Sequence, residues 1–154
     1  RNSNRGANQV RHIGIDPGVS GGIAWIDSGV PHAEKMPATI GDLWQLVAGL
    51  ETNECYCVIE KVHTSPQMGV KSAGTFMQGK GQLLMALCAG GIPHEQVSPH
   101  KWQRTLGLLS GKGKNKTDHK NKLKAKAQEL FPSLKITHAT ADALLLAEYC
   151  RRYR

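Results

Sequence analysis

Apolar residues recur near every second position early in the chain, which is the period of a half-buried β-strand. Val10, Ile13 and Ile15 fall roughly in this register, and the run ends at DPGVSGG, where proline and glycines favour a turn. Two similar runs follow closely, so the first three strands are expected to form an antiparallel meander. CYCVIE contains β-branched and aromatic residues and predicts a buried strand. The predicted strands are residues 10–16, 22–27, 31–36, 55–60 and 94–98.

Apolar residues spaced three and four apart predict helices in the rest of the chain. One helix is expected to begin with Ser98 as N-cap and Pro99 at its first position, and another to begin at Asp118 and end before Pro132. The other predicted helices are residues 41–50, 75–89 and about 139–151, and residues 62–74 predict a loop. Strands precede helices with a β–α–β crossover, which predicts one α/β domain over residues 10–154, after a polar, disordered tail at residues 1–9.

The net charge of +8 indicates a polyanionic partner, most often nucleic acid. No apolar run approaches the roughly 20 residues needed to span a bilayer, and the polar N-terminus lacks the apolar region of a signal peptide. The four cysteines have no CxxC spacing, so we expect reduced core residues of a cytosolic protein rather than disulfides or zinc ligands. They are Cys55, Cys57, Cys88 and Cys150.

Three carboxylates stand where predicted elements begin or end. Asp16 closes the first strand, Glu60 closes the CYCVIE strand, and Asp142 begins the last helix. Ligand sites in open α/β sheets gather outside the carboxyl ends of strands, so the three acids meet there if the two strands are neighbours. Crowded carboxylates repel one another, and a divalent cation relieves that repulsion. Oxygen ligands suit Mg²⁺ or Mn²⁺, and a pair of such ions can catalyse phosphodiester hydrolysis.

Each of these acids also has an ordinary structural explanation. Asp-Pro-Gly is a common turn, and Glu60 followed by Lys61 can form an ion pair at a strand end. An acid such as Asp142 in a first helical turn is favoured by the helix dipole, by roughly 0.3–1 kcal/mol. Their convergence in a basic protein, rather than any one of them, indicates a catalytic site.

Several ordered motifs resemble the RuvC family of Holliday junction resolvases, particularly its compact phage-type branch. The motifs are IGIDPG at 13–18, VIEKV at 58–62, TFMQGKGQL at 75–83, VSPHKWQRTLG at 97–107, NKTDHK at 115–120 and ADALLLA at 141–147. The resemblance implies a ribonuclease H-like fold with a mixed five-stranded sheet flanked by helices. It further implies a homodimer in the cytoplasm of a bacterial or phage-infected cell, which nicks four-way DNA junctions symmetrically with two Mg²⁺ ions, Mn²⁺ substituting.

By motif position, the family's metal-binding acids match Asp16, Glu60 and Asp142. Family members commonly carry a fourth ligand three or four residues before the last acid. Ala139 stands three residues before Asp142 and cannot bind metal, whereas His138 stands four before it, one helical turn away. The resemblance therefore makes His138 the candidate fourth catalytic and metal-binding residue.

A dense run of lysines predicts contact with the DNA backbone. Seven lysines and one acid occupy residues 112–126, and such a run repels itself unless phosphate is present, although a solvated helix face is the ordinary explanation. Lys116 matches a basic family position near the scissile phosphate, and the loop after Glu60 would reach the junction centre. The candidate DNA-binding residues are Lys61, His63, Lys71, Lys101, Arg104, Lys112, Lys114, Lys116 and Lys120.

Three other functions fit parts of this pattern. A glycine-rich turn after a strand-end Asp also cradles phosphate in actin-like ATPases and sugar kinases, but those need a second lobe for which 154 residues leave no room. A nuclease of the same fold that acts on flaps, forks or other branched DNA remains an alternative. So does a non-catalytic junction-binding protein, since Ala139 replaces a metal ligand.

Overall fold

The computed structural model describes residues 10–52, 54–111, 113 and 115–154. Five strands form one mixed sheet in the order β3-β2-β1-β4-β5. β2 pairs antiparallel with β1 and β3, whereas β4 pairs parallel with β1 and β5. The predicted mixed five-stranded α/β sheet and its meander are confirmed. The strands are β1 Arg11–Asp16, β2 Gly22–Asp27, β3 Val30–Lys35, β4 Cys55–Glu60 and β5 His94–Val97.

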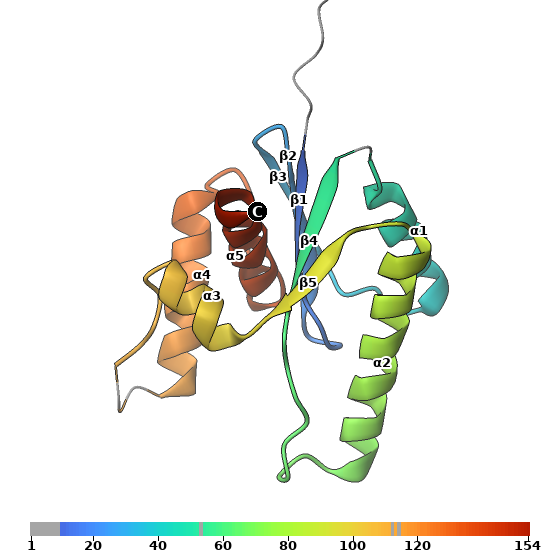
Figure 1. Cartoon of the computed structure of the whole chain (residues 1–154). Helices are drawn as coiled ribbons and strands as arrows, with labels where there is room; N and C mark the ends of the chain where they lie inside the picture. The colour runs from blue at the N-terminus through green and yellow to red at the C-terminus, as the bar shows by residue number, and fades with distance from the viewer. Residues whose placement is uncertain (1–9, 53, 112, 114) are drawn as a thin grey trace, which may run out of the picture.

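Helices cover both faces of this sheet (Figure 1). On one face lie α1 (Ile40–Leu50) and α2 (Val70–Ala89). On the other face, α5 (His138–Tyr153) lies against the sheet, with α4 (Lys116–Leu130) and the short α3 (Pro99–Thr105) outside it. Each layer has its own apolar core, one gathered around α5 and the other beneath α1 and α2.

Strand periodicity decides which side chains reach which layer. Ile13 and Ile15 of β1, like Cys57 and Ile59 of β4, enter the core beneath α1 and α2. Successive side chains of a strand point to opposite faces, so the residues between and after them face α5. Val58 belongs to the α5 core, as this alternation requires. The strand-ending acids Asp16 and Glu60 therefore point to the α5 side.

Two glycines allow α5 to lie directly on the strands. A Cβ at Gly14 of β1 would overlap backbone atoms of Ala143 and Ala147, and a Cβ at Gly22 of β2 would overlap the carbonyl oxygen of Ala139. Both glycines are needed because backbone atoms cannot move aside as a flexible side chain can. The three alanines are spaced four residues apart, so one small-residue face of α5 lies along the sheet.

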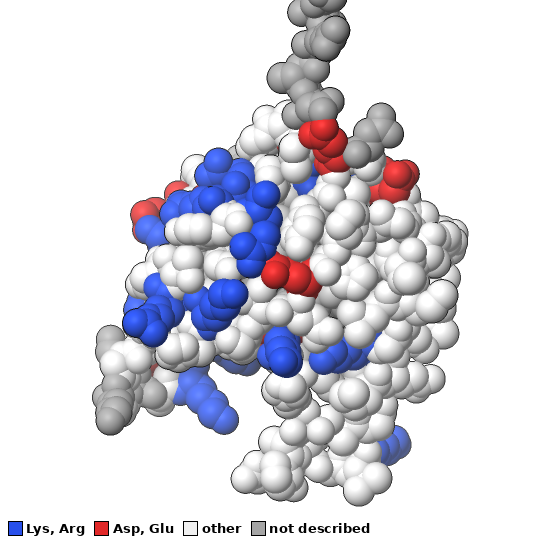
Figure 2. Space-filling view, in the orientation of Figure 1, with Lys and Arg blue, Asp and Glu red and all other residues white. Residues whose placement is uncertain are grey.

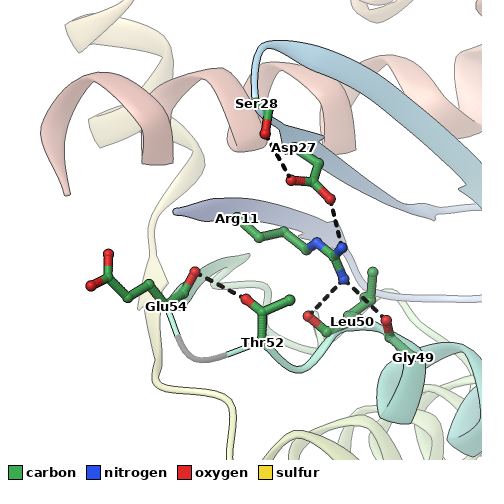
Figure 3. Close-up of polar contacts among 7 residues, drawn as sticks. All are labelled: Arg11, Asp27, Ser28, Gly49, Leu50, Thr52 and Glu54. Atoms are coloured by element: carbon green, nitrogen blue, oxygen red, sulfur yellow. Dashed lines mark hydrogen bonds and ion pairs between the residues drawn. The ribbon is translucent and has the colours of Figure 1, made fainter. Parts of the chain in front are cut away.

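Arg11 joins three elements at the opposite end of β1 from Asp16. Its guanidinium donates to Asp27 at 2.6 Å and to the carbonyls of Gly49 and Leu50 at 3.0 and 3.1 Å (Figure 3). These carbonyls end α1, where a positive charge stabilises the helix dipole. The hydrogen bond from Arg11 lowers the pKa of Asp27. The hydrogen bonds from Arg11 to these two carbonyls anchor the sheet to α1 far from the acid site.

Four helix starts differ from the prediction, that of α1 (Ile40) by one residue. α2 begins at Val70 instead of residue 75. The prediction places the start too late because Ser72 and Gly74 are residues typical of loops. α4 begins at Lys116, since the Asn115 side chain accepts the Asp118 backbone N–H at 2.8 Å and caps the helix. α5 begins at His138, so Asp142 lies in the second turn and the dipole explanation for it is wrong.

Other predictions have mixed outcomes. Ser98 caps α3 with Pro99 as its first residue, as predicted. All four cysteines are free thiols, but Cys88 is exposed rather than part of the core. Among the described residues, no helix is both long and apolar enough to cross a membrane. The predicted tail at residues 1–9 lies outside the described residues.

Candidate active site

Asp16 and Glu60 lie side by side because of the parallel register of their strands. Ile15 of β1 is paired with Ile59 of β4, and each acid is the next and last residue of its strand. Both point to the α5 side, as the alternation of side chains requires. This register explains why the two carboxylates lie close together at the carboxyl edge of the sheet, as predicted.

Asp142 reaches the same edge on α5. The preceding loop is tied to the helix start by the Thr137 backbone N–H, which donates to Thr140 Oγ1 at 3.2 Å. The close approach of Ala139 and Ala143 to the sheet then holds the first two turns of α5 over β1 and β2. Asp142 lies between these two alanines in sequence, and its charge acts on Asp16 and Glu60.

Burial makes all three acids difficult to ionise, and repulsion between the acids adds to this at Asp16 and Glu60. Burial, then the charges of Glu60 and Asp142, raise the pKa of Asp16 to about 8. Burial raises the pKa of Glu60 to about 7, with Asp142 adding to the effect. Burial also raises the pKa of Asp142. At neutral pH the cluster therefore retains protons in the absence of a counter-charge.

Trp102 orients Glu60, an interaction that the sequence did not predict. Its indole Nε1–H donates to Glu60 Oε2 at 2.9 Å, and this hydrogen bond opposes the rise in the pKa of Glu60. Trp102 is fully buried and Glu60 is only 8% exposed. The bond joins residues 42 positions apart in the chain. No local pattern in the sequence could have indicated it.

Three basic or potentially basic side chains lie close enough to act on Asp142. Lys120 has the largest effect in lowering the pKa of Asp142, followed by His119 and then His138. Lys120 also opposes the rise in the pKa of Asp16. His138 is exposed at the first position of α5. The structure thus brings His138 and Lys120 near the acids and adds His119, which sequence analysis missed.

His119 is held rigidly by neighbouring polar groups. Ser110 Oγ lies 2.7 Å from its Nδ1, and Gln103 Oε1 lies 3.0 Å from its Nε2. These contacts join α4 to α3 and to the segment that follows α3. Lys122 Nζ adds a bond to the carbonyl of Leu109 at 3.0 Å. In the sequence His119 stands between Asp118 and Lys120 and looks like an ordinary surface residue.

The three acids fit a divalent cation in donor type and in charge. Carboxylate oxygens are the ligands that Mg²⁺ and Mn²⁺ prefer, and a cation among these acids would favour their ionised forms against the cost of burial and the repulsion between them. Within the described part of the chain, however, no three His, Cys, Asp or Glu side chains are already arranged to hold a metal ion. The acids are gathered at one edge, and binding an ion would require their side chains to rearrange.

The candidate DNA-binding residues lie mainly on one side of the molecule. Figure 2 shows Lys and Arg concentrated over α3, α4 and α5, whereas the surface over α1 and α2 is largely uncharged. Lys71 lies in the first turn of α2 rather than in the predicted loop, and Lys112 and Lys114 lie outside the described residues. The other candidates are all exposed: Lys61, His63, Lys101, Arg104, Lys116 and Lys120.

No protein-family model matches the chain, and no curated protein matches it. Its structure, however, is similar to two solved structures of RuvC from Thermus thermophilus. RuvC in complex with a Holliday junction substrate superposes with a TM-score of 0.60 at 17% sequence identity, covering 94% of each chain. A second RuvC structure gives a TM-score of 0.59 at 15% identity, again over 94% of each chain. The chain therefore has the α/β, ribonuclease H-like fold of RuvC.

Proposed function

We propose that this protein is a metal-dependent endonuclease that resolves four-way DNA junctions by paired nicks. The observation that carries the proposal is the cluster of Asp16, Glu60 and Asp142, one buried and two partly buried carboxyls at one sheet edge with raised pKa values. The shared fold with RuvC, one structure of which holds a Holliday junction substrate, supports the choice of substrate.

The three acids would hold the metal ions, with His138 as the candidate fourth ligand. When bound, Mg²⁺ or Mn²⁺ polarises a phosphoryl oxygen and neutralises developing charge. The chain's own residues prepare the site. The Trp102 indole fixes Glu60 Oε2, and Lys120 supplies positive charge near Asp16 and Asp142. The exposed lysines of α3 and α4 hold the DNA backbone without reading its sequence.

A homodimer would match the twofold symmetry of a four-way junction. The outer face of α2 is a suitable contact surface because it carries an exposed row of uncharged residues spaced three or four apart. The row consists of Val70, Gly74, Met77, Gly81, Met85 and Cys88. Met77 and Met85 are 50% and 64% exposed, although both are apolar. Met85→Glu is expected to give a monomer in sedimentation experiments, and a variant that remains dimeric would place the contact elsewhere.

The decisive assay compares a labelled four-way junction with a duplex, a flap and a fork in Mg²⁺. We expect symmetric nicks in the junction alone, and a loss of more than about 100-fold in rate for Asp16→Asn. Asp118→Asn is the matched control, since Asp118 is an exposed acid of α4. Equal cutting of flaps or forks would favour the branched-DNA alternative.

Two further outcomes separate the remaining possibilities. Tight junction binding without cleavage in either Mg²⁺ or Mn²⁺ would favour a non-catalytic binding protein, the alternative raised by Ala139. His138→Ala is expected to reduce the cleavage rate while leaving junction affinity unchanged. Full activity in that variant would remove His138 from the metal site and leave the three acids as the ligands.

A further inference from the structure

A cleft of about 490 Å³ lies at the far end of α5 from the acid cluster. Arg152 on its rim is ten residues after Asp142, which corresponds to about 15 Å along a helix. Polar and apolar groups line the cleft about equally, and the apolar residues on its floor include Ile26, Pro31, Leu130 and Phe131. Its volume is in the range of sites that take a small ligand or a few side chains.

Two arginines on the rim are held in place by a buried carboxylate. Glu148 is 3% exposed and accepts two hydrogen bonds from Arg151, each of 2.8 Å, and one from Arg152, of 2.6 Å. Burial opposes ionisation of Glu148, but the bonds from both arginines outweigh it and lower its pKa. Glu148 therefore stays charged and fixes both guanidiniums.

Glu148 uses only some of the N–H donors of the two guanidiniums. Each carries five N–H donors, of which Glu148 takes two from Arg151 and one from Arg152. The two side chains are 48% and 42% exposed. The local charge is also unbalanced, because two cations face one carboxylate. Burial and the charge of Arg151 lower the pKa of nearby His12, which disfavours a further positive charge there.

This combination of groups fits a particular class of partner. Guanidiniums bind carboxylates through paired hydrogen bonds, and fixed ones lose little entropy on binding. The apolar lining residues beside them can contact an aliphatic or aromatic side chain. Duplex DNA offers phosphates but no apolar group that could enter such a cleft. We propose that this cleft binds an acidic peptide segment of a partner protein, with carboxylates on Arg151 and Arg152 and an apolar side chain on the floor.

The proposal extends beyond nuclease activity and can be tested without it. A fluorescently labelled peptide with several aspartates and a C-terminal phenylalanine is titrated with the full chain, and binding is followed by anisotropy. We expect saturable binding that is lost when serine replaces either the phenylalanine or the aspartates. Arg152→Ala is expected to weaken binding about tenfold, the size of one lost charge-assisted hydrogen bond. Lys135→Ala, which removes an exposed cation outside the cleft, should have no effect.

A second pair of variants keeps the test independent of the arginine network. Ser133 lies on the cleft rim and is exposed. Ser133→Asp adds a negative charge and should abolish peptide binding, whereas Ser133→Ala should preserve it. The proposal fails if the peptide does not saturate, if the phenylalanine is dispensable, or if Arg152→Ala and Lys135→Ala act alike. It also fails if the peptide does not bind and Arg152→Ala instead weakens binding of a labelled duplex.

Discussion

Replacing Asp16 with asparagine is expected to stabilise the metal-free protein while abolishing its nuclease activity. Burial and the neighbouring acids raise the pKa of Asp16 from 3.8 to about 8, so folding disfavours its ionised form. The folded state binds more protons than the unfolded state between these values, and stability therefore falls as the pH rises from about 4 to 8. Asparagine has nearly the same shape but carries no charge, so it removes this cost.

The size of the effect follows from the same pKa values. At pH 8 the cost of ionising Asp16 in the fold has an upper limit of about 5 kcal/mol, and at pH 5 it falls to about a third of that. Water entry and the shared proton equilibria of the cluster reduce the cost. We expect Asp16→Asn to gain about 1–3 kcal/mol at pH 8, or about 3–10 °C in Tm for a domain of this length.

The measurement is thermal and urea unfolding in EDTA at pH 5 and pH 8. Asp118→Asn, at an exposed position in the first turn of α4, is the control and should lose no more than about 1 kcal/mol, since it removes only an interaction with the helix dipole. Mg²⁺ should raise the Tm of the unmodified protein at pH 8 but not that of Asp16→Asn, because the cation replaces the missing counter-charge. The reasoning is refuted if Asp16→Asn is no more stable at pH 8, or if its advantage is as large at pH 5.

Three other variants test the parts that support the site. Gly14→Ala should destabilise the fold by about 2–4 kcal/mol in urea unfolding, because its Cβ overlaps the backbone of α5; Gly49→Ala, with open space around it, is the control and should not destabilise. Trp102→Phe removes the hydrogen bond to Glu60 and is expected to move the acid limb of the pH–rate profile to higher pH; an unchanged limb would mean that Glu60 does not titrate in the reaction. Lys120→Gln should lower the slope of log affinity against log salt by about one, and an unchanged slope would exclude a phosphate contact there.

Much of the fold could be predicted because its signals are local. Alternating apolar residues indicate the strands. Asp16 and Glu60 are indicated as site residues because each is the last residue of a predicted strand. The errors came from weak local signals. The first helical residues of α2 include Ser72 and Gly74, whose low helix propensity did not prevent helix formation, although the buried residues of α2 (Leu83, Ala86 and Leu87) lie further along. Cys88 is expected in the core but is exposed, because an apolar stretch of sequence does not show which face of a helix packs against the sheet.

The sequence by itself determined that two acids end strands, that a third lies near the start of the last helix, and that many basic residues accompany them. Only the tertiary structure decided which groups act on those acids. Trp102 reaches Glu60 and Lys120 acts on Asp16 and Asp142 because α3, α4 and α5 pack on one face of the sheet. The physical reason is distance along the chain. Periodicity and turn chemistry act over a few residues, whereas hydrogen bonds and charge effects depend on spatial proximity, which packing alone creates.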